Sequence, residues 1–142
     1  MKLADFAGPA EPVTQADVDA AAQALGVSAA KVQAVREVES SGRGIHPDTK
    51  RPIILFEPHV FHRETQGKYA ANNQISYAKW GARPYPVKQE DRYAQLVAAM
   101  ALDETAALRS ASWGGFQIMG FNHQASGYPS VQAFVQAMIR GD

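Results

Sequence analysis

A carboxylate occupies an apolar position at the end of a predicted helix. In residues 28–39, "SAAKVQAVREVE", Val32, Val35 and Val38 recur at helical spacing and share one face. Glu39 falls on that face too, where burial disfavours the charged form and raises the pKa of a carboxyl group. A carboxyl that stays protonated near neutral pH can give its proton to a leaving oxygen, as glycoside hydrolysis requires. The alternative is a helix-end glutamate that reaches solvent or pairs with a nearby arginine.

A second group of candidates lies in residues 110–123, "SASWGGFQIMGFNH". Paired glycines let a backbone approach a ligand closely. The amide side chains of Gln117 and Asn122 can donate and accept hydrogen bonds, which suits hydroxyl and N-acetyl groups. Trp113 offers a face on which a sugar ring can stack. The alternative is a buried turn whose large apolar side chains simply belong to the core.

A third candidate, Glu57, closes a short apolar run. Residues 51–58, "RPIILFEP", predict a strand or an extended buried segment. A glutamate at the end of such a run can be a buried structural residue paired with Arg51, Arg63 or a histidine.

A long loop is predicted after a short helix that we expect within residues 59–70. Its sequence, "NNQISYAKWGARPYP" at residues 72–86, has aromatic residues, glycine and proline but no period. Long ordered loops are often functional, so Tyr77 and Tyr85 are candidates for substrate contacts.

The rest of the chain predicts a mainly α fold with at most a small β element. Residues 1–12 are expected to form an N-terminal tail, and residues 13–142 one domain. Asp103 and Ser130 are suited to cap the helices that follow them. Helical periodicity or capping signals indicate helices at residues 14–25, 28–39, 88–102, 103–111 and 130–140.

The amino-acid composition of the chain excludes several classes of protein. The chain has 142 residues, 46% of them hydrophobic and 20% charged, which fits one globular domain. The formal net charge is zero, so there is no electrostatic footprint for nucleic acid or an anionic membrane. Cysteine is absent, which excludes disulfides. No apolar run has the length of a signal peptide or a membrane span. We therefore expect a protein made soluble in the cytoplasm, without a membrane anchor.

The four histidines do not predict a metal site. His59 and His62 are spaced H-x-x-H with Glu57 two residues before, whereas helical zinc pairs prefer a spacing of four. His46 and His123 are isolated in the sequence. We expect no metal and no cofactor.

The order of these motifs resembles a known superfamily. "VESSG" at residues 38–42, followed by "SWGGFQIMGFNH" at residues 112–123, resembles the lysozyme-like superfamily that includes goose-type lysozymes and soluble lytic transglycosylases. "RPIILFEPHVFHRETQGKY" at residues 51–69 is similar to the N-acetylmuramidase family common among bacteriophage endolysins. The resemblance covers residues 15–140, nearly the whole chain.

The resemblance implies a lysozyme-like helical domain that hydrolyses the β-1,4 bond between N-acetylmuramic acid and N-acetylglucosamine in peptidoglycan. In it, Glu39 matches the catalytic general acid. Glu57 matches an acidic position of the muramidase family, which makes it the candidate for a second polar group at the same site. The second cleft motif is matched by Ser112, Trp113, Gly114 and Gln117. The implied partner is the glycan strand of the cell wall, reached after release from the host cytoplasm.

The sequence departs from the superfamily at its C-terminal end. Members usually carry a further helix with an Ala-Tyr-Asn-Gly-like motif, and this sequence ends before any such motif. We therefore expect residues 13–142 to lack the C-terminal helices of the family. A monomer is expected, with self-association as the alternative if the chain is truncated.

Three other functions stay open at this point. A lytic transglycosylase would cleave the same bond without water and form a 1,6-anhydro product. A metal-dependent amidase or peptidase would act on the same wall and would be sensitive to a chelator. A non-catalytic wall-binding module would bind the wall but would not lyse it.

Overall fold

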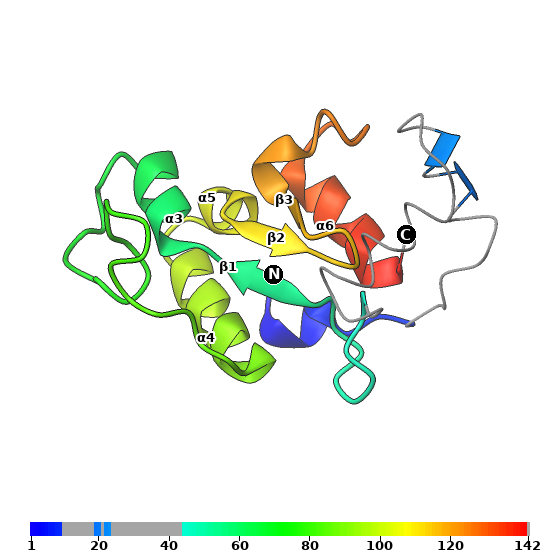
Figure 1. The fold of residues 1–142 in the computed structure, drawn as a ribbon, viewed down its shortest axis with the longest axis horizontal. Helices are drawn as coiled ribbons and strands as arrows, with labels where there is room; N and C mark the ends of the chain where they lie inside the picture. The colour runs from blue at the N-terminus through cyan, green and yellow to red at the C-terminus, as the bar shows by residue number, and fades with distance from the viewer. Residues whose placement is uncertain (10–18, 21, 24–43, 142) are drawn as a thin grey trace.

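The computed structural model describes residues 1–9, 19–20, 22–23 and 44–141 (Figure 1). The fold is mainly helical with a small antiparallel sheet, as the sequence predicted. The named elements are, in chain order, η1 (Leu3–Phe6), β1 (Ile54–Phe56), α3 (Pro58–Glu64), α4 (Gln89–Met100), α5 (Glu104–Arg109), β2 (Ala111–Trp113), β3 (Ile118–Met119), η2 (Gly120–Asn122) and α6 (Val131–Arg140).

Two predicted helices fall wholly or largely outside these residues. Of the helix expected at residues 14–25, positions 19–20 and 22–23 are described, and they are helical. The helix expected at residues 28–39, and Glu39 with it, lies outside the described part of the chain.

The sheet has the order β1-β2-β3, with both pairs antiparallel. In the pairing of β1 with β2, Ile54 lies opposite Trp113 and Leu55 lies opposite Ser112. Because side chains alternate across a strand, Ile54 and Trp113 share one face and Leu55 and Ser112 share the other. Ile54 and Trp113 are fully buried, so the first of these faces is the core side of the sheet.

Helix α4 packs against β1 and completes its free edge. The Gln89 side chain accepts a hydrogen bond from the backbone N–H of Ile54 (2.9 Å) and donates one to its carbonyl (2.8 Å). These two bonds take the place of a neighbouring strand and leave no open edge at Ile54. Farther along the helix, Tyr93, Leu96 and Met100 are buried, as the period predicted.

The predicted helix caps are confirmed. The Asp103 side chain accepts a hydrogen bond from the N–H of Ala106 (3.0 Å) at the start of α5. The Ser130 hydroxyl accepts one from the N–H of Ala133 (3.1 Å) at the start of α6. Each bond satisfies one of the amide groups that a helix start leaves unpaired.

The N-terminal segment, expected as a tail, contributes to the core. Phe6 is fully buried, and its ring lies 5.4 Å from the Tyr93 ring and 5.8 Å from the Trp113 ring. The N-terminal ammonium group of Met1 pairs with Glu104 on α5. A sequence pattern does not reveal this packing, because the apolar residues around Phe6 are few and follow neither a helix nor a strand period.

The core lies between the sheet and the helices around it. Phe56, Leu108, Phe134 and Val135 are among its fully buried members. Among the described residues, no helix is long and apolar enough to cross a membrane.

Candidate active site

Strand β1 divides the core from the candidate site. Its even-numbered residues, Ile54 and Phe56, face the core and are fully buried. Glu57 follows in an extended conformation (φ −116°, ψ 99°), and its N–H donates to the carbonyl of Ser110 at 2.9 Å. Alternation therefore places the Glu57 side chain on the face that carries Leu55 and Ser112. The apolar run that predicted the strand also determines which way this carboxylate points.

Glu57 is half-buried and accepts a hydrogen bond from the Tyr85 hydroxyl, with an oxygen–oxygen distance of 2.9 Å. Burial raises the pKa of Tyr85 to about 12, and its hydrogen bond to Glu57 adds to the rise. Tyr85 therefore keeps its proton at neutral pH and can serve as a constant donor to the carboxylate. Among the described residues, Glu57 has no arginine or histidine ion-pair partner, so the predicted alternative of a structural ion pair is not what the structure shows.

Tyr77 lies in the same environment. Burial raises the pKa of its hydroxyl, Arg83 lowers it, and the nearby charge of Glu57 raises it. The Tyr77 hydroxyl also makes a long contact of 3.5 Å to the carbonyl of Arg83. We call Glu57, Tyr77 and Tyr85 the acid–tyrosine cluster. The structure thus brings together three residues that the sequence had proposed separately.

Trp80 is a neighbour of this cluster that the sequence analysis missed. Its side chain is 67% exposed, and its indole group lies near enough to Tyr85 to lower the pKa of that hydroxyl. A signal was available in the sequence. Trp80 stands in a loop without a period, where a large aromatic side chain has no helix face or strand face to bury it.

A second group of predicted residues forms the turn between β2 and β3. The Ser112 hydroxyl donates to the Gln117 side-chain oxygen (2.9 Å). The Gln117 amide nitrogen donates to the carbonyls of Ile53 (3.1 Å) and Gly114 (2.8 Å). We call Ser112, Gly114 and Gln117 the turn cluster. Both amide protons of Gln117 are used within the protein, so its role is to hold the turn rather than to donate to a ligand.

The turn cluster is built on a left-handed backbone. Gly114 has a φ of +75° and Gln117 a φ of +50°, a region that costs about 1–2 kcal/mol for a residue with a side chain. The three hydrogen bonds of Gln117 compensate for that cost. A Cβ added at Gly114 would also lie 3.3 Å from the Met138 sulfur on α6. Both the backbone conformation and this neighbouring side chain therefore favour glycine at position 114.

Trp113 does not fit the proposed sugar contact. It is fully buried, its ring stacks near Phe6, and its indole N–H donates to the carbonyl of Leu108 (3.2 Å). Because it pairs with Ile54 on the core face of the sheet, no part of its ring faces solvent. The prediction of sugar stacking for Trp113 is corrected to a core role. The sequence showed an aromatic residue beside glycines but not the face of the strand on which it lies.

Asn122 ends η2 and is exposed. Within the described residues, its backbone carbonyl accepts from Ser126, and no contact joins its side chain to Glu57. Among the described residues, no hydrogen bond therefore joins Asn122 to the acid–tyrosine cluster or to the turn cluster.

Three of the four histidines have structural partners, whereas the buried Nδ1 of His59 has no hydrogen-bond partner within the described residues. His46 Nδ1 accepts from the N–H groups of Asp48 and Thr49 (3.2 and 3.4 Å). His123 Nδ1 donates to the carbonyl of Tyr128 (2.9 Å), and His62 Nδ1 bonds to the Ser76 hydroxyl (3.1 Å). The described part of the chain contains no group of three or more histidine, aspartate or glutamate side chains placed to hold a metal ion.

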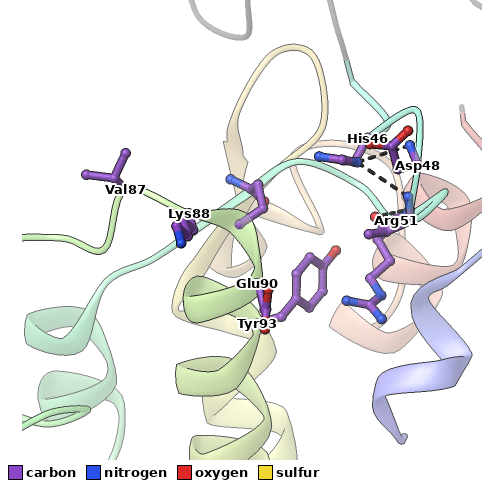
Figure 2. A pocket seen from close by; sticks show the side chains of 9 residues that line it. His46, Asp48, Arg51, Val87, Lys88, Glu90 and Tyr93 are labelled. Atoms are coloured by element: carbon purple, nitrogen blue, oxygen red, sulfur yellow. Dashed lines mark hydrogen bonds between the residues drawn. The ribbon is translucent and has the colours of Figure 1, made fainter.

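A pocket of about 460 Å³ lies elsewhere, between the turn at residues 46–49 and the start of α4 (Figure 2). None of the predicted site residues that the structure describes lines it. Its wall carries both acidic and basic side chains, whereas the acid–tyrosine cluster has an acidic side chain and no basic one. Its lining residues are His46, Asp48, Thr49, Arg51, Val87, Lys88, Gln89, Glu90 and Tyr93.

Gly44 is the first described residue after Glu39, five positions later in the chain. It packs against the turn that contains the turn cluster. A Cβ added at Gly44 would lie 2.9 Å from the backbone nitrogen of Gly115, and the Gly44 carbonyl accepts from the N–H of Ile53 (2.9 Å). Gly44 thus lies between β1 and the turn cluster.

The model of the N-acetylmuramidase family matches residues 28–142. The chain is similar to the crystal structure of the Burkholderia AP3 phage endolysin, with 43% sequence identity and a TM-score of 0.74. The match covers 89% of this chain and 48% of that one, so this chain spans about half the length of that protein. A comparison with curated proteins gave no match. The chain belongs to the N-acetylmuramidase family.

Proposed function

We propose that this chain hydrolyses the β-1,4 glycosidic bond between N-acetylmuramic acid and N-acetylglucosamine in peptidoglycan. The observation that carries the proposal is the family match over residues 28–142, a range that includes Glu39, Glu57 and the turn cluster. The geometry at Glu57 supports it, because a half-buried carboxylate held by a tyrosine hydroxyl lies on the non-core face of the sheet.

The two carboxyl groups would have different roles. Glu39 would protonate the leaving glycosidic oxygen as the general acid. Glu57 accepts a hydrogen bond, so it is suited to accept a proton from an attacking water rather than to donate one. If the water attacks from the opposite face of the sugar, the reaction inverts. Inversion requires the two carboxyl groups to lie roughly 6.5–9.5 Å apart.

The other predicted site residues would position these groups or bind the glycan. Tyr85 and Tyr77 border Glu57. The turn cluster fixes the turn against which Gly44 packs. Asn122 stays a proposed substrate contact, which its exposure permits. The place of action would be the cell wall after release from the host cytoplasm, as in an endolysin.

The test is lysis of purified peptidoglycan by the wild-type chain beside the Glu39→Gln and Glu57→Gln variants. Each substitution removes a carboxyl group and nearly preserves its shape. Glu90→Gln is the matched control, because Glu90 is exposed in the first turn of α4 and belongs to neither cluster. Circular dichroism and thermal unfolding would verify that each variant is folded.

Loss of lysis in both site variants, with lysis kept in Glu90→Gln, would support the assigned roles. Mass spectrometry of the soluble products separates hydrolysis, which adds a water, from transglycosylation, which forms an anhydro end. A Glu39→Gln variant that lyses like the wild type would refute the acid assignment. A folded wild-type chain that binds the wall but releases no product would favour the binding-module alternative.

A further inference from the structure

Trp80 exposes more of an aromatic ring than any core-building role requires. It is the one aromatic residue among the exposed large apolar side chains of the described chain, at 67% exposure. An indole ring offers a large, rigid apolar surface, and leaving it in water forgoes the stabilisation that burial would give. A single exposed apolar residue is ordinary by itself, so the argument depends on what surrounds this ring.

The ring lies near the candidate carboxylate. Trp80 stands between Tyr77 and Tyr85 in one loop, and the contact of the Tyr77 hydroxyl with the carbonyl of Arg83 (3.5 Å) closes the loop around it. The Tyr85 hydroxyl, whose pKa the nearby Trp80 lowers, donates its proton to Glu57 at 2.9 Å. Most of the indole surface is left to solvent. This arrangement places an apolar platform on the loop whose Tyr85 bonds to Glu57.

The loop that carries Trp80 is anchored on both sides of it. Before Trp80, Ile75 is buried and the fully buried Ser76 bonds to His62 on α3 (3.1 Å). After it, the carbonyl of Pro86 accepts from Arg92 Nε on α4 at 2.8 Å. The loop therefore spans from α3 to α4, on the side of the molecule where these helices lie in Figure 1. A ring presented from two fixed ends loses little further freedom when it binds a ligand.

We infer that Trp80 forms a sugar-binding subsite, in which a pyranose ring of the glycan strand stacks on the indole face beside the acid–tyrosine cluster. The inference rests on the proposed function and names the binding surface of that site. A pyranose ring fits this surface because one face of the sugar is lined by C–H groups while its edges carry hydroxyl and amide groups. Trp113, the second tryptophan, is fully buried and cannot take this role.

The composition of the chain gives a direct test, because it contains only two tryptophans. Tryptophan fluorescence would be recorded with iodide as quencher, using the full Glu39→Gln chain. The probe would be a soluble peptidoglycan tetrasaccharide. Trp80 is accessible to iodide and Trp113 is not. The tetrasaccharide should shift the emission to the blue and protect it from iodide, and both effects should be absent in the additional variant Trp80→Phe.

Kinetics on soluble glycan separate stacking on the ring from any role of the indole N–H. Trp80→Ala should raise KM by roughly three- to tenfold with kcat little changed, as expected when an aromatic contact that binds substrate and transition state equally is removed. Trp80→Phe keeps a ring but loses the indole N–H, so it should recover most of the KM. Val87→Ala is the matched control, because Val87 is 90% exposed, lies close by in the chain and is not aromatic.

The outcomes distinguish this inference from the proposed function. Wild-type turnover together with an unshifted, unprotected emission would overturn the subsite and leave the hydrolase proposal intact. Equal KM values for Trp80→Ala and the wild type would overturn it as well, as would a KM for Trp80→Phe as high as that of Trp80→Ala. A protected emission without any wild-type turnover would support the subsite and contradict the hydrolase proposal.

Discussion

Replacing Tyr85 with phenylalanine tests whether the acid–tyrosine cluster takes part in the reaction. The substitution removes one oxygen atom, the donor of the 2.9 Å hydrogen bond to Glu57, and keeps the ring. Both side chains of the Tyr85–Glu57 pair are half-buried, so water can replace part of what is lost.

The size of the effect follows from the type of bond. A hydrogen bond to a charged group contributes about 1.5–3 kcal/mol, and partial exposure favours the lower end of that range. About 1.4 kcal/mol corresponds to a tenfold change in rate. If Tyr85 holds Glu57 in position for the attacking water, Tyr85→Phe should lower kcat by roughly tenfold and leave KM nearly unchanged.

The assay is the initial rate on soluble glycan over a range of substrate concentrations. Tyr69→Phe is the matched control, because it removes the same atom from a tyrosine whose hydroxyl donates to the carbonyl of Leu102 at 3.2 Å. The control should keep the wild-type kcat. A folded Tyr85→Phe variant with kcat within twofold of the wild type would refute the assignment of Glu57 and Tyr85 to the reacting centre.

Three further predictions concern the core, a close backbone contact and metal dependence. Phe6→Ala should lower the free energy of unfolding by about 3–5 kcal/mol in urea titrations, because it empties a fully buried position between Tyr93 and Trp113; a loss below 1 kcal/mol would contradict the packing. Gly120→Ala should cost about 3 kcal/mol or prevent folding, since its Cβ would lie 2.1 Å from the backbone carbonyl oxygen of Leu108; a wild-type melting temperature would rule this contact out. A chelator should leave lysis unchanged, and loss of lysis that zinc restores would instead support the metal-dependent amidase.

The helices and their starts could be predicted because their signals are local. Asp103 and Ser130 each cap the helix that follows, and the apolar period of residues 88–102 marked the buried face of α4. The strand ending at Phe56 followed from an apolar run between prolines. These features depend on neighbours within a few residues, which a sequence displays directly.

The contacts between distant segments could not be predicted. Phe6 packs against Tyr93 and Trp113, and no pattern near residue 6 indicates this. The bond from Tyr85 to Glu57 spans 28 positions and depends on the path of a loop without a period. The sequence therefore named Glu57 and Tyr85 as candidates without showing that they touch. It named Trp113 for a surface role because it could not show which face of β2 is buried.

The alternation of β1 connects the stability of the core with the geometry of the site. Ile54 and Phe56 fill the core, and Glu57 lies on the opposite face because it is an odd-numbered neighbour. A slip of β1 by one residue would turn Glu57 toward the core side occupied by Trp113 and bring apolar side chains to the site face. Gln89 opposes such a slip, since its two hydrogen bonds recognise the backbone of Ile54 alone. The register of a three-residue strand is therefore held from both edges, and the direction of the candidate carboxylate is determined by the same contacts that bury the core.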